Sequence, residues 1–126
     1  KEKRIRISSA AEDLSEPVLK YFKAREDLGI SIKGIHPDTP NSRKLLKMSP
    51  VSDLSILIPK IKYCFSSDFA IYDEKIGFMS AKNGGWAVII ENKEMSDVMK
   101  SLFDLAFEEA KKLNRGNLNL KEKITS

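Results

Sequence analysis

Hydrophobic and polar residues alternate in several short stretches of the chain, which is the pattern of strands with one buried face. In residues 4–8 (RIRIS), Ile5 and Ile7 fall on one side and the two arginines on the other. Residues 29–35 (GISIKGI) alternate in the same way. These two stretches predict the first two strands of the fold.

A helix is predicted between these strands, from Glu16 to Asp27, with Ser15 as its N-cap and Pro17 in its first turn. Two strands in one sheet joined by a helix form a β-α-β unit, whose crossover is right-handed. The segment HPDTPNS, residues 36–42, contains two prolines and predicts a turn. The RKLLKM that follows predicts one or two helical turns.

The second half of the chain predicts further strands at IKYCF (61–65), FAIY (69–72), IGFMS (76–80) and WAVIIE (86–91). Tight turns separate the last three, and the Asn-Gly pair within KNGG is a strong hairpin signal. Residues 86–91 are apolar on both faces, which predicts a central strand. The segment before residue 61, SPVSDLSILIPK, is ambiguous between loop, short helix and strand.

A long amphipathic helix is predicted after Asn92, its N-cap, with Asn114 and Gly116 as the stop signal. Its apolar residues recur at helical spacing and form one wide stripe: Met95, Val98, Met99, Leu102, Phe103, Ala106, Phe107, Ala110 and Leu113. The stripe predicts packing onto the sheet, and the alternative is that part of it contacts a second copy. The order β-α-β-α-β-β-β-α predicts an α/β fold, a mixed β-sheet covered by helices.

Size and composition fit one globular domain spanning residues 1–126, since the chain is 41% hydrophobic and 32% charged. No apolar run approaches the ~20 residues of a membrane span. The first residues, KEKRIRISS, are basic but lack the apolar core of a signal peptide. We therefore expect a cytoplasmic protein without a membrane partner.

Charge and residue counts limit the chemistry. The net charge of +4 permits contact with an anion, but 22 basic and 18 acidic residues are interspersed, which argues against a direct nucleic-acid binder. The most basic region is the tail, KKLNRGNLNLKEKITS. With Cys64 and His36 each alone of their kind, the set of ligands for a structural zinc site is missing. We expect a buried thiol at Cys64, no metal and no cofactor.

Four segments, in their order and spacing, resemble the phospholipase-D-like effector domain of TrmB-type transcriptional regulators: KGIHPDTPNSRKLL, IKYCF, DFAIYDEKIGFMSA and WAVIIENKEMSDVMKSLFDLAFEEAKKL. The resemblance implies a phospholipase-D-like half-domain that senses a small effector, such as a sugar or another metabolite, and forms a homodimer. In those regulators the domain follows a winged helix-turn-helix, which this sequence lacks. DNA contact would come only through such an attached domain.

The hairpin around Asp73 decides between an enzyme and a binding module. Enzymes of the phospholipase D type carry H-x-K-x-x-x-x-D, in which the histidine attacks phosphorus and the lysine stabilises the phosphate oxygens. With Asp73 aligned to the aspartate, Ser66 occupies the histidine position and Asp68 the lysine position. We therefore expect a catalytically inactive domain in which Asp73 starts a turn. The alternative is a phosphodiesterase-type hydrolase with displaced catalytic residues, in which His36 is the nucleophile or base.

Ligands of α/β sheets gather outside the carboxyl ends of strands. Ser8, Ser9 and His36 stand at two such ends, and Ser66 and Asp68 precede another strand. Trp86 follows two glycines and either caps a pocket or packs. The predicted ligand crevice therefore consists of Ser8, Ser9, His36, Ser66, Asp68 and Trp86. The alternative for His36 is an ordinary polar surface group in a loop.

Overall fold

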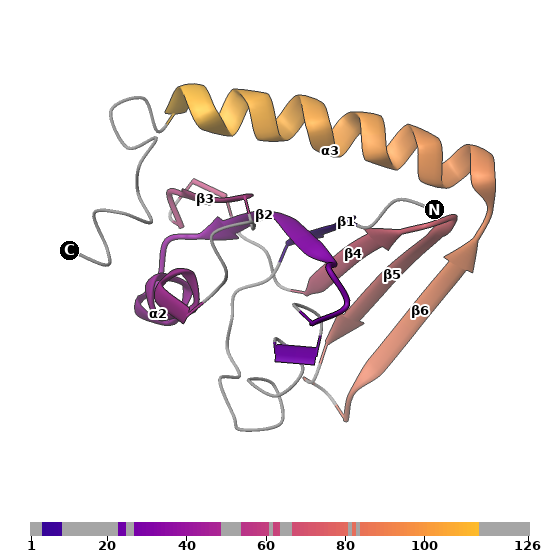
Figure 1. Cartoon of the computed structure of the whole chain (residues 1–126), viewed down its shortest axis with the longest axis horizontal. Helices are drawn as coiled ribbons and strands as arrows, with labels where there is room; N and C mark the ends of the chain where they lie inside the picture. The colour runs from indigo at the N-terminus through magenta and orange to yellow at the C-terminus, as the bar shows by residue number, and fades with distance from the viewer. Residues whose placement is uncertain are drawn as a thin grey trace.

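The computed structural model describes residues 4–8, 23–24, 27–48, 54–60, 62–63, 67–80, 82 and 84–113 (Figure 1). The elements are β1 (Arg4–Ser8), β2 (Ser31–Pro37), α2 (Pro40–Met48), β3 (Leu54–Ile58), β4 (Asp68–Tyr72), β5 (Lys75–Ser80), β6 (Trp86–Glu91) and α3 (Lys93–Leu113). The expectations for the helix at 16–27, for Ser9, Cys64 and Ser66, and for the stop at Asn114 and Gly116 lie mainly or wholly outside these residues.

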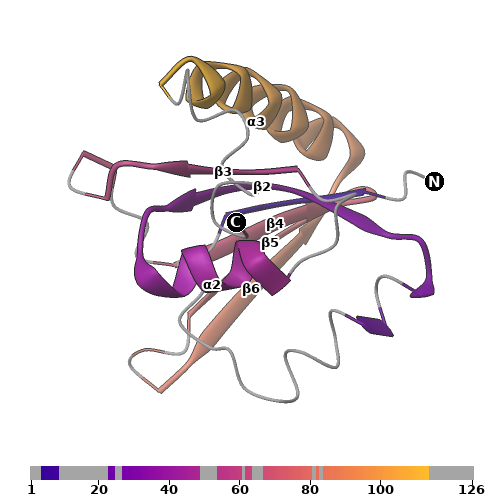
Figure 2. The ribbon, with the colours of Figure 1, turned by 60° about the vertical axis from the view of Figure 1, so that its left-hand side comes forward.

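The described strands form one six-stranded sheet in the order β3-β2-β1-β4-β5-β6. The pairs β1–β2 and β2–β3 are parallel, whereas β1–β4, β4–β5 and β5–β6 are antiparallel. Helix α3 lies over one face of the sheet and α2 over the other (Figure 2). The predicted α/β class, a mixed sheet covered by helices, is therefore confirmed.

The predicted element order has three strands after α2, whereas the described residues form four, in line with the number of strand segments read from the sequence. The strand expected at 61–65 is misplaced, because Lys62 lies in a turn and Tyr63 in irregular chain. The third parallel strand is instead Leu54–Ile58, within the segment left ambiguous. Its Leu57 and Ile58 are buried, so contact with the core selects this apolar run as the strand.

The prediction that residues 86–91 form a central strand is also wrong, because β6 is an outer strand of the sheet. Its side chains are largely exposed, 44% for Trp86 and 62% for Ile89. An apolar composition on both faces therefore does not mean here that both faces are buried. The hairpin predicted before it is confirmed: β5 and β6 pair antiparallel, and Gly84 and Gly85 adopt φ of 85° and 82°.

The core lies between α3 and the sheet. Phe103, Phe107 and Ala110 of α3 are at most 5% exposed. They pack against sheet residues of four strands, namely Ile35, Ile58, Ile71 and Ile76. The ring centroids of Phe69 and Phe78 lie 5.7 Å apart, and those of Phe69 and Phe103 lie 6.2 Å apart. Burial of these side chains, each worth roughly 1.5–3 kcal/mol, orients the helix on the sheet.

Four of the nine residues in the predicted apolar stripe of α3 face this core. Met99, Phe103, Phe107 and Ala110 face the sheet. Other members are exposed to solvent: Met95, Val98, Leu102, Ala106 and Leu113. The helix is thus apolar over a wider arc than the sheet covers.

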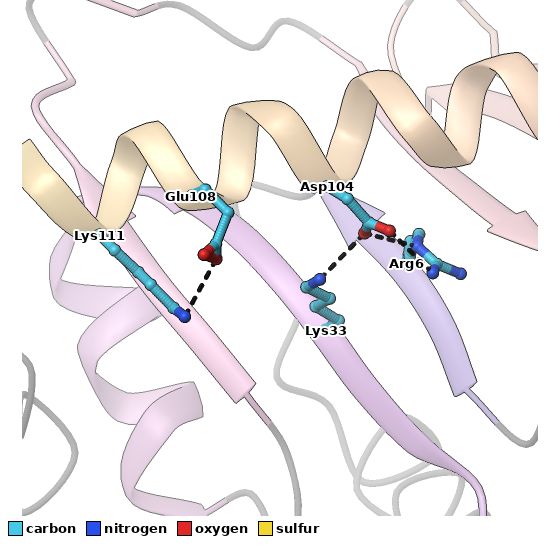
Figure 3. Close-up of polar contacts among 5 residues, drawn as sticks. All are labelled: Arg6, Lys33, Asp104, Glu108 and Lys111. Carbon is cyan, nitrogen blue, oxygen red and sulfur yellow. Dashed lines mark hydrogen bonds and ion pairs between the residues drawn. The ribbon is translucent and has the colours of Figure 1, made fainter.

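An ion-pair cluster of three charged residues links α3 to the sheet (Figure 3). Asp104 accepts two hydrogen bonds from Arg6 of β1, at 2.9 Å and 3.1 Å, and one from Lys33 of β2, at 2.9 Å. The hydrogen bonds from Arg6, followed by that from Lys33, lower the pKa of Asp104. Because Arg6 and Lys33 are adjacent in the sheet register, one carboxylate can bind both.

Candidate functional site

The predicted crevice residues that the structure describes all lie toward one end of the sheet. Ser8 and His36 are at the carboxyl ends of β1 and β2. Because β4 and β6 run opposite to these strands, Asp68 and Trp86, their first residues, lie toward the same end. These four residues therefore lie toward one end of the sheet, and the ligand crevice itself stays a prediction.

The four residues are nevertheless divided between the two faces of the sheet. Ser8 is in register with Ile35, and Trp86 lies two residues from Val88, the partner of Phe78. Since Ile35 and Phe78 contact the core under α3, Ser8 and Trp86 face α3. His36 and Asp68 each follow or precede such a core residue, so they face α2.

His36 and Asp68 stand at the same level on two strands separated by β1. Ser8 of β1 pairs with Ile35 on one side and Phe69 on the other. Two strand spacings of about 4.8 Å place their backbones roughly 10 Å apart. These two residues therefore share one face and one level of the sheet, but His36 is 2% exposed, so a common ligand stays a prediction. Ser8 and Trp86 are on the other face, three spacings apart.

Ser8 is the more unusual of the residues under α3. It is 2% exposed, and no hydrogen-bond partner lies within reach of its Oγ among the described residues. A buried hydroxyl without a partner costs about 1–3 kcal/mol. Such a group is either a local strain in the fold or a donor for a ligand, and the crevice role of Ser8 stays a prediction.

His36 is not the exposed loop residue that its neighbouring prolines suggested. It lies inside β2, 2% exposed. Its ring covers Gly34, where an added Cβ would stand 2.5 Å from Nε2 and 3.2 Å from the Ser55 hydroxyl. The glycine is thus required by the close approach of the imidazole, and the imidazole is enclosed by the sheet and its neighbours.

The two aspartates of the hairpin do not converge. Asp68 begins β4, and Asp73 follows the last residue of that strand. Five residues of extended chain separate them by roughly 17 Å. Asp73 adopts φ of 50°, a left-handed conformation that Asp and Asn tolerate better than most residues, and it starts the β4–β5 turn as predicted.

A polar cleft of about 320 Å³ lies at the other end of the sheet and was not predicted. Its walls come from the β4–β5 turn, the end of β6 and the start of α3: Asp73, Glu74, Lys75, Glu91, Lys93, Asp97 and Lys100. The pairing of Lys75 with Glu91, and a hydrogen bond from Asn92 N to Glu74 O of 2.9 Å, bring these segments together. A sequence-based prediction of this cleft would have required the register of the β5–β6 hairpin, which sets Lys75 opposite Glu91.

The cleft is lined by opposite charges that bind one another. Lys93 donates to Asp97 at 2.8 Å, and this hydrogen bond raises the pKa of Lys93 and lowers that of Asp97. Carboxylates and ammonium groups together suit a small, strongly polar molecule. Among the described residues, no group of three or more His, Cys, Asp or Glu is placed to hold a metal ion.

No model of a protein family matches the chain, and no curated protein matches it in sequence. Among solved structures, the chain is similar to TrmBL2, an archaeal chromatin protein described as showing a novel mode of DNA binding. The match has a TM-score of 0.59 and 17% identity, and covers 85% of this chain and 44% of TrmBL2. The two proteins therefore share a fold, and this chain spans less than half the length of TrmBL2. No helix of the described residues is long and apolar enough to cross a membrane.

Proposed function

We propose that this chain is the regulatory domain of a TrmB-like transcription regulator, a catalytically inactive phospholipase-D-like domain that binds an effector, dimerises, or does both. The observation that carries this proposal is the shared fold over 85% of the chain with TrmBL2, a DNA-binding protein. DNA recognition would belong to an attached winged helix-turn-helix domain. The domain described here would bias that partner between two arrangements.

The absence of catalysis rests on the chemistry of the hairpin. A phosphodiesterase of this type needs a cation beside the phosphate, whereas the carboxylate of Asp68 would repel the phosphate. The displaced-residue alternative needs His36 to reach phosphorus. The imidazole is 2% exposed, which supports a structural role over a nucleophilic one.

The test combines light scattering, thermal unfolding and an activity assay on the purified chain. We expect the mass of a dimer, no hydrolysis of a chromogenic phosphodiester, and a higher melting temperature with one member of a panel of sugars and phosphorylated metabolites. A monomer with no ligand response would contradict the proposal. Hydrolysis that is lost in His36→Ala would favour the enzyme instead.

A second candidate is direct nucleic-acid contact, and four exposed lysines on α2 and just after β3 favour it. Lys44 and Lys47 lie on α2, and Lys60 and Lys62 follow β3. If these residues bind phosphates, the isolated chain should bind duplex DNA with a steep salt dependence. Replacing Lys44 and Lys47 by Ala should then weaken binding, whereas Lys82→Ala, on the distant β5–β6 hairpin, should not.

A further inference from the structure

The outer strand β6 presents an apolar edge. It lies beyond β5 at the end of the described sheet, so one row of its backbone N–H and C=O groups has no strand beside it there. From Trp86 to Ile90 it contains neither a charge nor a proline, which are the usual devices that keep an edge unpaired. Val88 and Ile89, one on each face, are 50% and 62% exposed.

The opposite edge of the same sheet has a different character. Strand β3 buries Leu57 and Ile58, which are 2% and 5% exposed, and α3 packs against it. Pro59, which has no N–H group, follows its last residue. Of the two outer strands of the described sheet, β6 therefore has the more exposed side chains.

The first turn of helix α3 extends this apolar surface. Met95, four residues after the end of β6, is 47% exposed. Beyond this turn the helix crosses the sheet away from β6, because Asp104 binds Arg6 of β1 and Lys33 of β2, three and four strands from that edge (Figure 3). Leu102 and Leu105 are also exposed, at 53% and 69%, but they therefore lie over the middle of the sheet.

We propose that this β6–α3 surface binds the same surface of a second copy of the chain, with the two β6 strands side by side and antiparallel. The surface consists of Trp86, Val88, Ile89 and Met95. This inference deepens the dimerisation part of the proposed function and rests on it. It assigns the residues through which two copies meet.

The sequence of β6 is complementary to itself, which is why the occupant is a second copy. A two-fold axis makes the paired strands antiparallel. With Val88 opposite Val88 of the second copy, Trp86 faces Ile90 and Ala87 faces Ile89. Glu91 then falls opposite Gly85, so that the two carboxylates do not face each other. A different protein would have to supply an equally uncharged edge of the same length.

The first test measures solution mass by light scattering. We expect the unmodified chain to have twice the chain mass of 14.2 kDa, and Ile89→Lys and Val88→Lys to be monomers with unchanged circular dichroism. Leu54→Lys is the matched control, because Leu54 is 46% exposed at the other edge, and it should stay a dimer. A dimer that persists in both test variants overturns this surface but leaves the proposed function standing. A monomeric unmodified chain overturns dimerisation itself.

A second test does not depend on disrupting the contact. In a Cys64→Ser background, Val88→Cys places one thiol at the two-fold axis. Facing residues of antiparallel strands have Cα atoms about 4.5–5.5 Å apart, which suits a disulfide. Mild oxidation should cross-link two copies of Val88→Cys and leave Leu54→Cys uncross-linked. Equal cross-linking of both variants, or of neither, would contradict the proposed pairing.

Discussion

Four polar residues are buried in the described part of the chain, and they differ in how their hydrogen bonds are satisfied: Ser8, His36, Ser42 and Ser96. Ser42 lies 3.0 Å from the Thr39 hydroxyl and its N–H donates to the same oxygen, which caps α2. The Ser96 hydroxyl donates to the carbonyl of Lys93 at 2.9 Å inside α3. Ser8 alone among these serines has no such acceptor or donor.

Replacing Ser8 by alanine should therefore stabilise the fold, because it removes a buried hydroxyl without a partner. We expect the free energy of unfolding to rise by about 1 kcal/mol, and the melting temperature by about 4 °C. Urea unfolding and calorimetry measure both. Ser42→Ala is the control and should lower stability, since its hydroxyl is hydrogen-bonded. A lower stability of Ser8→Ala would mean that its hydroxyl has a partner in solution.

Gly34→Ala should destabilise the protein by about 1–3 kcal/mol, because the new methyl group would overlap the buried His36 ring. The double variant Gly34→Ala/His36→Ala tests the cause. If the imidazole is the obstacle, the alanine at position 34 should cost clearly less in that background. Additive losses measured by urea unfolding would locate the strain elsewhere.

Asp104→Asn should lower the free energy of unfolding at neutral pH by about 1 kcal/mol, a modest value because the side chain is 40% exposed. The pKa of Asp104 is lowered in the folded state, so its stabilisation is present above the ordinary aspartate pKa of about 3.9 and is lost as pH falls through the lower, folded value. The difference from the unmodified chain should thus shrink in strongly acidic solution. A difference independent of pH would exclude the carboxylate as its source.

At the scale of elements, the long helix was the easiest to predict and its environment the hardest. Periodicity located α3, and Asn92 caps it as expected, accepting a hydrogen bond from Met95 N at 2.9 Å. The apolar pattern, however, does not show which of these residues the sheet covers. That depends on how the helix crosses the strands, which is set by contacts such as Phe69 with Phe103 and Arg6 with Asp104.

Asn92→Ala should destabilise α3 through loss of the cap, by about 1 kcal/mol. Hydrogen exchange should increase mainly at the amides of the first turn, including Met95 and Ser96. Asn92→Ser keeps an acceptor oxygen and is expected to retain most of the stability. Equal losses in both variants would show that the amide side chain acts through some other contact.

At the scale of the whole molecule, the sequence predicted the layers but not the order of strands. Pro37 and Pro40 suggested a turn and hid the fact that His36 and Pro37 belong to the strand. The apolar segment at 61–65 resembled a strand more than 54–58 did. The local sequence does not contain the long-range contacts that decide which segment becomes a strand. For the site, strand ends were predictable, but the face on which each side chain falls required the register.

A dimer joined at the β6–α3 surface predicts that thermal stability depends on protein concentration. Between about 1 µM and about 100 µM, the melting temperature should rise, since mass action favours the associated state. Differential scanning fluorimetry across this range measures the slope. Ile89→Lys should give a melting temperature that does not change with concentration, and a flat response of the unmodified chain would contradict association in this range.

The difference between the two sheet edges determines how many further copies one chain can bind. A strand protein with two open edges is divalent and can polymerise, adding copies at either end into a fibre. Here the side chains of β6 are largely exposed, whereas those of β3 are mostly half-buried or buried, so we expect β6 to be the edge that pairs. If β6 alone pairs, growth stops after a single addition, and the chain associates without forming a fibre.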